Sequence, residues 1–384
     1  MTPFRIDIAQ ADLDDLTARL RRTRLPDQLE GSGWNYGTDL DFLRHFIDYW
    51  AEGFDWRRAE TRLNGFPQFI TEIDGQSVHF VHLKSDASGA VPILLANGWP
   101  SNFVELLPLA LRLATGQAGS APAAFDVVIP SLPGYGFSGK PKRPGINLTA
   151  TAGLWAKLMT RLGYDRFLTS ASDLGAGAVL ALLHNDVERI LGAHWCNVYS
   201  QYPRPDNPSD AEKAYFKNVD LWMMTEGAYA MEQGTKPSTL AVGLNDSPAG
   251  LAAWIIEKFR SWSDSGGDVE THFGIDTLCT IVSVYWFTQT IGSSIRMYKE
   301  AFADRERIVK PLPASDVQHA VFVPAACDLP APREWADRHL PNLVQWTVPG
   351  KGGHFPALEV PDLLADDIRA FAHKVVTQPA SLAS

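Results

Sequence analysis

Short apolar segments that alternate with segments of helical spacing restrict the fold of this chain more than any other feature. Five strand-like runs occur between residues 78 and 195: Val78–Leu83, Pro92–Asn97, Asp126–Pro130, Arg166–Ala171 and Ile190–Trp195. Helix-like segments separate several of them: Val104–Ala114, Thr149–Leu162 and Ala176–His184. Strands that are apolar throughout are typical of parallel sheets covered by helices on both faces. We therefore predict an α/β fold with a mostly parallel sheet.

This alternation of strand and helix signals stops near Val198. From about residue 200 to 310 the chain is rich in Trp, Tyr, Met and Thr at helical spacing and has no clear strand. Strand signals return at Val317–Pro324 and Leu343–Thr347, and a helix is expected from Pro361 to Val375. The helical part therefore interrupts the α/β part.

We accordingly divide the chain into three parts. Residues 76–199 and 311–384 form the α/β core, and residues 200–310 form a helical lid over the carboxyl ends of the strands, where open α/β sheets bind ligands. Residues 1–75 form an N-terminal extension that packs on the core. The elements expected in it are helices at Ile8–Arg24 and Leu40–Trp50, then extended chain with turns over 64–77.

The net charge and the cysteines restrict the binding partners and the cellular compartment that we expect for this protein. The net charge is 34 − 44 = −10, which argues against a nucleic-acid surface and gives no sign of an anionic-membrane partner. The three cysteines, at 196, 279 and 327, have neither disulfide nor zinc spacing. No signal peptide or bilayer-length apolar run is present. We expect a cytoplasmic protein without a membrane anchor; a monomer and a homodimer both stay open.

Residues 171–175 (ASDLG) lie between a strand and a helix and have the form small-x-nucleophile-x-small. Small residues on either side permit the sharp turn of a nucleophile elbow, with Asp173 as nucleophile. Ser172 as nucleophile would place Leu174 where a small residue is needed. The residues alone leave a second interpretation open, in which Asp173 only caps the helix.

Two further residues complete a candidate triad. His354 follows a glycine pair just after the last strand-like run, and Asp328 follows the strand that ends near Pro324. A loop histidine and a turn-forming aspartate are the ordinary interpretations of each alone. Together they give the order nucleophile Asp173, acid Asp328 and base His354, which is the order of the α/β-hydrolase triad.

Residues 97–100 (NGWP) follow a strand and predict an oxyanion loop. In an α/β hydrolase this loop donates a backbone N–H, here that of Trp99, and the residue after the nucleophile, here Leu174, donates the second. The alternative is an ordinary turn bounded by glycine and proline.

With these motifs the chain resembles the microsomal-type epoxide hydrolases, a branch of the α/β-hydrolase superfamily with an N-terminal extension. The similarity covers nearly the whole chain. It is carried by WNYG (34–37), FDWR (54–57), NGFP (64–67), GGHF (352–355) and, in the lid, by AY (228–229) with QGTKP (233–237) and by SS (293–294) with Arg296, Tyr298, Lys299 and Glu300. The resemblance implies that Tyr229 and Tyr298 are the two phenols that hold the epoxide oxygen.

This chain departs from the family pattern at several positions. The family usually has His where Asn97 stands, and often Trp where Leu174 stands. Ala171 and Ser172 replace the usual glycines, and the acid region, which holds Asp328, is one residue shorter than in some relatives. The resemblance also implies a cis Trp99–Pro100 bond.

The implied reaction opens an apolar epoxide, aromatic ones included, to a vicinal diol through a covalent ester on Asp173. The substrates are a small-molecule epoxide and water, and no metal or organic cofactor is expected. Bacterial secondary metabolism and detoxification both fit such an enzyme. Two alternatives stay open: a haloalkane-type dehalogenase with the same aspartate nucleophile, in which Asn97 would help to bind halide, and a non-catalytic α/β-hydrolase-like binding protein.

Overall fold

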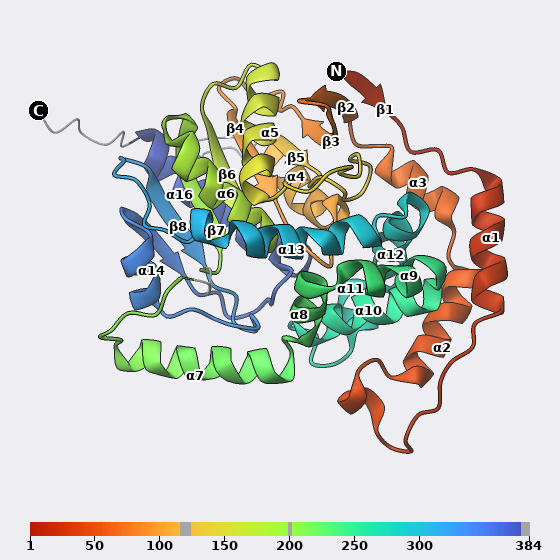
Figure 1. Cartoon of the computed structure of the whole chain (residues 1–384). Coiled ribbons are helices and arrows are strands. Elements are labelled where there is room, and N and C mark those ends of the chain that lie inside the picture. The colour runs from red at the N-terminus through yellow and green to blue at the C-terminus, as the bar shows by residue number, and fades with distance from the viewer. Residues whose placement is uncertain (116–123, 199–201, 378–384) are drawn as a thin grey trace, which may run out of the picture.

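A computed structural model describes residues 1–115, 124–198 and 202–377, and within these residues nine strands form one sheet (Figure 1). Their order in the sheet is β1-β2-β3-β5-β4-β6-β7-β8-β9. The bounds are β1 Thr2–Phe4, β2 Gln68–Ile73, β3 Gln76–Leu83, β4 Val91–Ala96, β5 Phe125–Pro130, β6 Phe167–Ala171, β7 Ile190–Cys196, β8 Gln318–Phe322 and β9 Leu343–Thr347. The expected boundary at 199–200 and the end of the chain at 378–384 lie outside the described residues.

The predicted mostly parallel sheet is confirmed. Strands β5, β4, β6, β7, β8 and β9 are parallel neighbours, whereas β1, β2 and β3 form an antiparallel edge. Strand β1 was not predicted, because its three residues are largely exposed and have no alternation. Strand β2 lies where extended chain with turns was expected, and it pairs with β3 through a tight turn at Asp74 and Gly75.

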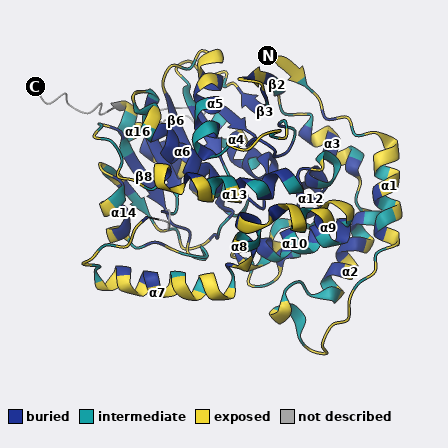
Figure 2. Ribbon diagram, viewed as in Figure 1, coloured by how far each residue is buried: buried dark blue, intermediate teal, exposed yellow. Residues whose placement is uncertain are grey.

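Helices cover both faces of the sheet, as predicted. Helices α4 and α16 pack together on one face, and α5 and α6 pack together on the other (Figure 1). The bounds in the core are α4 Leu107–Ala114, α5 Leu148–Arg161, α6 Asp173–Asn185, α14 Arg333–His339, α15 Pro356–Glu359 and α16 Pro361–Thr377. Helix α6 begins three residues earlier than the spacing suggested, at Asp173 itself. The buried strands and the inner sides of these helices form the hydrophobic core (Figure 2).

Seven helices lie between β7 and β8 in the described part of the chain. Their bounds are α7 Asp210–Thr225, α8 Ala228–Thr235, α9 Pro237–Asp246, α10 Pro248–Ser261, α11 Val269–Phe273, α12 Ile275–Thr288 and α13 Ile291–Ile308. Prolines at the first positions of α9 and α10 suit helix starts, because a proline there sacrifices no helical N–H bond. Ser209 begins α7 through a capping box with Glu212. Helix α7 runs along the outside of the molecule, with a largely exposed outer surface (Figure 2).

The N-terminal extension contacts two parts of the molecule. Its helices lie against the helices that follow β7, and its strands β1 and β2 belong to the sheet. Their bounds are α1 Gln10–Arg21, α2 Leu40–Asp48 and α3 Trp56–Leu63. The Thr38 hydroxyl donates to the carbonyl of Ala253 in α10 at 2.8 Å, and the Trp50 indole donates to the Ser283 hydroxyl of α12 at 2.9 Å. The extension therefore ties the helical insertion to the sheet edge.

Candidate active site

Asp173 occupies the turn between β6 and α6. Its φ of +48° lies in the left-handed region, which is uncommon for a residue other than glycine and occurs mainly where the surrounding structure imposes it. A Cβ on Gly175 would lie 2.8 Å from the backbone carbon of Ala96, so a larger residue two positions after Asp173 would force the turn open. The helix N-cap is Ser172, and the Asp173 carboxylate turns instead toward the β4 loop.

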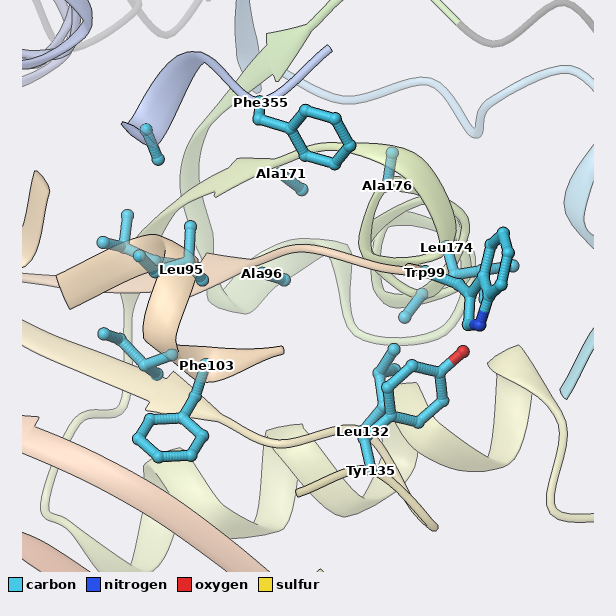
Figure 3. Packing of buried hydrophobic residues seen from close by; sticks show 14 of the residues in the cluster. Leu95, Ala96, Trp99, Phe103, Leu132, Tyr135, Ala171, Leu174, Ala176 and Phe355 are labelled. Carbon is cyan, nitrogen blue, oxygen red and sulfur yellow. The ribbon is translucent and has the colours of Figure 1, made fainter. Parts of the chain in front are cut away.

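The loop after β4 holds this carboxylate. The Trp99 amide donates to Oδ1 of Asp173 at 3.0 Å, and the Leu174 amide also donates to the carboxylate. Trp99 and Leu174 lie side by side beyond the strand ends that carry Ala96 and Ala171 (Figure 3). A Cβ on Gly98 would lie 2.0 Å from Oδ1 of Asp173, so this position requires glycine. The Trp99–Pro100 bond is cis, as predicted.

Asn97 forms this loop without the histidine that the family usually has. Its Nδ2 donates to the carbonyl of Asn102 at 2.9 Å and to Oε2 of Glu105 at 2.8 Å. Burial raises the pKa of Glu105 to about 7, against the lowering effect of the Asn97 hydrogen bond. The sequence offered no reason to select Glu105, since a lone acid in an apolar helical segment resembles any surface residue.

The predicted pairing of Asp328 with His354 is present in the geometry. Nδ1 of His354 lies 3.0 Å from Oδ1 of Asp328, and Nε2 lies 3.7 Å from Oδ2 of Asp173. Glu359 holds the loop that carries His354, because its carboxylate accepts hydrogen bonds from the amides of Gly353 at 3.0 Å and Phe355 at 2.9 Å. The shorter acid region therefore still reaches the histidine.

The charges of Asp173, Asp328 and His354 shift one another's pKa values. Burial lowers the pKa of His354, but the Asp328 and Asp173 carboxylates outweigh it and raise that pKa to about 9. Burial raises the pKa of Asp173, against the effects of His354 and the two amides. Burial would also raise the pKa of Asp328, but the His354 charge and hydrogen bond bring it below the usual value. The geometry thus favours an ionised Asp328 beside a protonated imidazole.

The lid tyrosines lie opposite the carboxylate. Tyr229 in α8 stacks on Trp99 with ring centroids 5.2 Å apart, and Tyr298 in α13 meets Tyr229 edge-on at 5.8 Å. Both rings are buried, and the Tyr298 hydroxyl has no hydrogen-bond partner of standard geometry among the described residues. Burial, with smaller contributions from Tyr229 and Asp173, raises the pKa of Tyr298 well above the usual value. The phenol therefore keeps its proton at neutral pH.

One cavity of about 700 Å³ is lined by the three triad candidates, Leu174 and both tyrosines. Its lining is more apolar than polar and includes three exposed side chains: Met223, Met231 and Phe302. In the described part of the chain, no three His, Cys, Asp or Glu side chains gather as metal ligands would. None of the described helices is both long and apolar enough to cross a bilayer.

Comparison with known proteins agrees with this architecture. Residues 1–106 match the family model for the epoxide hydrolase N terminus, and residues 91–244 match that for the alpha/beta hydrolase fold. The chain is 35% identical to epoxide hydrolase 1 of Sus scrofa over 96% of this chain and 88% of that protein.

Solved structures give the same result over nearly the whole chain. The juvenile hormone epoxide hydrolase of Bombyx mori superposes with a TM-score of 0.86 at 30% identity, covering 98% of this chain and 94% of that one. The Aspergillus niger epoxide hydrolase superposes with a TM-score of 0.86 at 32% identity, covering 97% and 96%. The chain therefore belongs to the epoxide hydrolases of the α/β-hydrolase fold.

Proposed function

We propose that this epoxide hydrolase works through a covalent ester on Asp173, with Tyr229 and Tyr298 as acids and His354 as the base of the second step. One observation carries the proposal: a carboxylate held by the Trp99 amide faces an imidazole and two buried phenols in one cavity. A carboxylate nucleophile divides one difficult hydrolysis into two easier steps.

In the first step, a carboxylate oxygen of Asp173 attacks an epoxide carbon and the C–O bond of the ring breaks. The departing oxygen would be an alkoxide, which is a poor leaving group, so a phenol proton from Tyr229 or Tyr298 is needed. The raised pKa of Tyr298 keeps that proton on the phenol until the ring opens.

In the second step, the imidazolium of His354 first gives its proton to the phenolate left by ring opening. The neutral imidazole then takes a proton from water, and the hydroxide attacks the ester carbonyl. The negative charge on the former carboxylate oxygen is stabilised by the amides of Trp99 and Leu174, which already point at that group. Collapse of the tetrahedral intermediate breaks the ester bond, and the departing alkoxide takes the proton of the new Asp173 carboxyl group. This releases the vicinal diol and restores the Asp173 carboxylate. Asp328 orients the imidazole and stabilises its positive charge.

We further propose an apolar epoxide as substrate, with an aromatic one favoured. The cavity wall includes aromatic and aliphatic side chains from the lid, among them Tyr202, Trp222 and Met223. The dehalogenase alternative gains little from Asn97, because its amide donates to Asn102 and Glu105 within the loop.

The test is a comparison of two assays on the purified protein. We expect diol formation from styrene oxide and no chloride release from 1-chlorohexane. Chloride release without diol would support the dehalogenase, and ligand binding without either product, across a broad epoxide panel, would support a non-catalytic protein. Chiral chromatography of racemic epoxides then gives the regio- and stereoselectivity.

A further inference from the structure

The Asn197 side chain connects the end of β7 to the loop that carries Asp328. Its Nδ2 donates to the carbonyl of Leu329 at 2.7 Å and to Sγ of Cys327 at 3.2 Å. Its Oδ1 accepts from the amide of Ala331 at 3.1 Å and from that of Val198 at 2.8 Å. Both ends of this amide are therefore used, and three of the four bonds reach residues around Asp328.

Few backbone-to-backbone hydrogen bonds hold this loop in the described part of the chain. Asp328 lies between β8 and α14 in a stretch without helix or strand, and the backbone bonds nearby are those of Ala326 to Gly352 and Cys327 to Pro324. The Cys327 thiol lies 3.4 Å from the same Oδ1 of Asp328 that pairs with His354. A chain of contacts thus runs from Asn197 through Cys327 to Asp328 and His354.

The backbone at Asn197 also suits this role. Its φ of +70° is in the left-handed region, where Asn and Asp are the commonest residues after glycine. Asn197 follows β7 directly, and its backbone amide donates to the carbonyl of Phe322 in β8 at 2.8 Å. A side chain on this turn faces the neighbouring loop rather than the next strand.

We propose that Asn197 is a positioning residue: by fixing the loop 327–331 it holds Asp328 against His354 and so governs the base step of the reaction. The kinetic consequence rests on the two-step mechanism proposed above. Ester formation uses Asp173 and the phenols, and His354 acts on it only through its charge, which helps to keep Asp173 ionised. Ester hydrolysis uses the Asp328–His354 pair directly, as its base.

The test is Asn197→Gly, which keeps the left-handed turn without strain and removes all four side-chain bonds. Asn342→Gly is the matched control. Asn342 directly precedes β9 and also has a left-handed backbone, with φ of +56°. Its Nδ2 donates to the carbonyl of Ser315 at 2.9 Å. We expect Asn197→Gly to slow ester hydrolysis about 10-fold, which corresponds to the net contribution of about one hydrogen bond, as measured by rapid quench. Ester formation should keep its rate, so kcat and KM fall together and kcat/KM stays constant.

A second readout needs no turnover. Asp328 raises the pKa of His354, so a less well held Asp328 should lower that pKa below about 9 in an NMR titration of Asn197→Gly, but not of Asn342→Gly. If no ester forms in the wild type, the proposed mechanism fails, and this titration still decides the role of Asn197.

The proposal is overturned if Asn197→Gly leaves both the His354 pKa and ester hydrolysis unchanged. It is also overturned if kcat and kcat/KM fall equally with an unchanged pKa, which would indicate a structural role alone. Should Asn197→Gly fail to fold by circular dichroism, Asn197→Asp replaces it. That variant retains the acceptor for Ala331 and Val198 and removes the bonds donated to Leu329 and Cys327. Because it also adds a negative charge near Asp328, its readout is kinetic alone: kcat should again fall while kcat/KM stays constant.

Discussion

Nε2 of His354 lies 3.7 Å from Oδ2 of Asp173, beyond hydrogen-bond distance but close enough for each charge to affect the other. The carboxylate is one of the groups that raise the pKa of His354 to about 9. Ester formation would neutralise this carboxylate and remove that contribution. The pKa of His354 should then fall during the cycle, at the point where a neutral imidazole is needed as a base.

The first prediction concerns the covalent intermediate. In His354→Gln the base is absent while the Asp173 carboxylate and the phenols remain, so a reactive epoxide should accumulate as an ester. Intact mass should rise by the mass of the epoxide, and peptide mapping should place the adduct on the fragment that contains Asp173.

Asp173→Ala is the control and should carry no adduct on that fragment. An unmodified His354→Gln would mean either that His354 also assists ring opening or that water attacks directly. A single wild-type turnover in ¹⁸O-water separates these outcomes, because the ester route takes the new oxygen of the first diol from Asp173. Labelled first-turnover diol would exclude the ester.

The second prediction concerns the lid phenols. Tyr229→Phe and Tyr298→Phe each remove a proton donor but keep a ring that can pack against Trp99. Each should slow ring opening, and the double variant should lose about 10²–10⁴-fold, the usual contribution of general acid catalysis. Pre-steady-state ester formation is the measurement. Full activity in the double variant would remove both tyrosines from the mechanism.

The third prediction concerns the pH response of His354. Because Asp328 and Asp173 both raise its pKa, Asp328→Asn and Asp173→Ala should each lower the value obtained by NMR titration, and Asp328→Asn the more, since Asp328 contributes more. Ester hydrolysis needs the neutral imidazole, so its rate should rise with pH and level off above the pKa of the esterified enzyme. That midpoint should lie below the midpoint of about 9 for the free enzyme. A midpoint above that of the free enzyme would contradict the charge coupling.

The fourth prediction concerns the loop after β4. Gly98→Ala would place a methyl group 2.0 Å from Oδ1 of Asp173 and 2.7 Å from the Leu174 nitrogen, so the amide donors must move away. Loss of one oxyanion donor typically costs about 10²–10³-fold in kcat. Gly243→Ala in α9, where a Cβ meets nothing within 4 Å, should keep wild-type activity. Equal activity of the two variants would show that the loop is not held as the structure indicates.

Much of the architecture followed from local sequence patterns. Parallel strands that are buried on both faces need mostly apolar residues, so β4, β5 and β6 were visible as short, largely apolar runs. The order of Asp173, Asp328 and His354, each at the carboxyl end of a strand, was also readable, because such ends meet at one edge of the sheet. The edge strand β1 could not be predicted from the sequence, because its three residues are mostly exposed and only its pairing with β2 defines it.

Only the tertiary structure decided how these residues interact. The 3.0 Å contact of Asp328 with His354 and the approach of Tyr298 to Tyr229 join parts of the chain that no local pattern relates. The same is true of Glu105 beneath Asn97 and of Asn197 beside Cys327. Amphipathic spacing reports which residues are buried, whereas hydrogen-bond partners and raised pKa values depend on what the folded chain brings within a few ångströms.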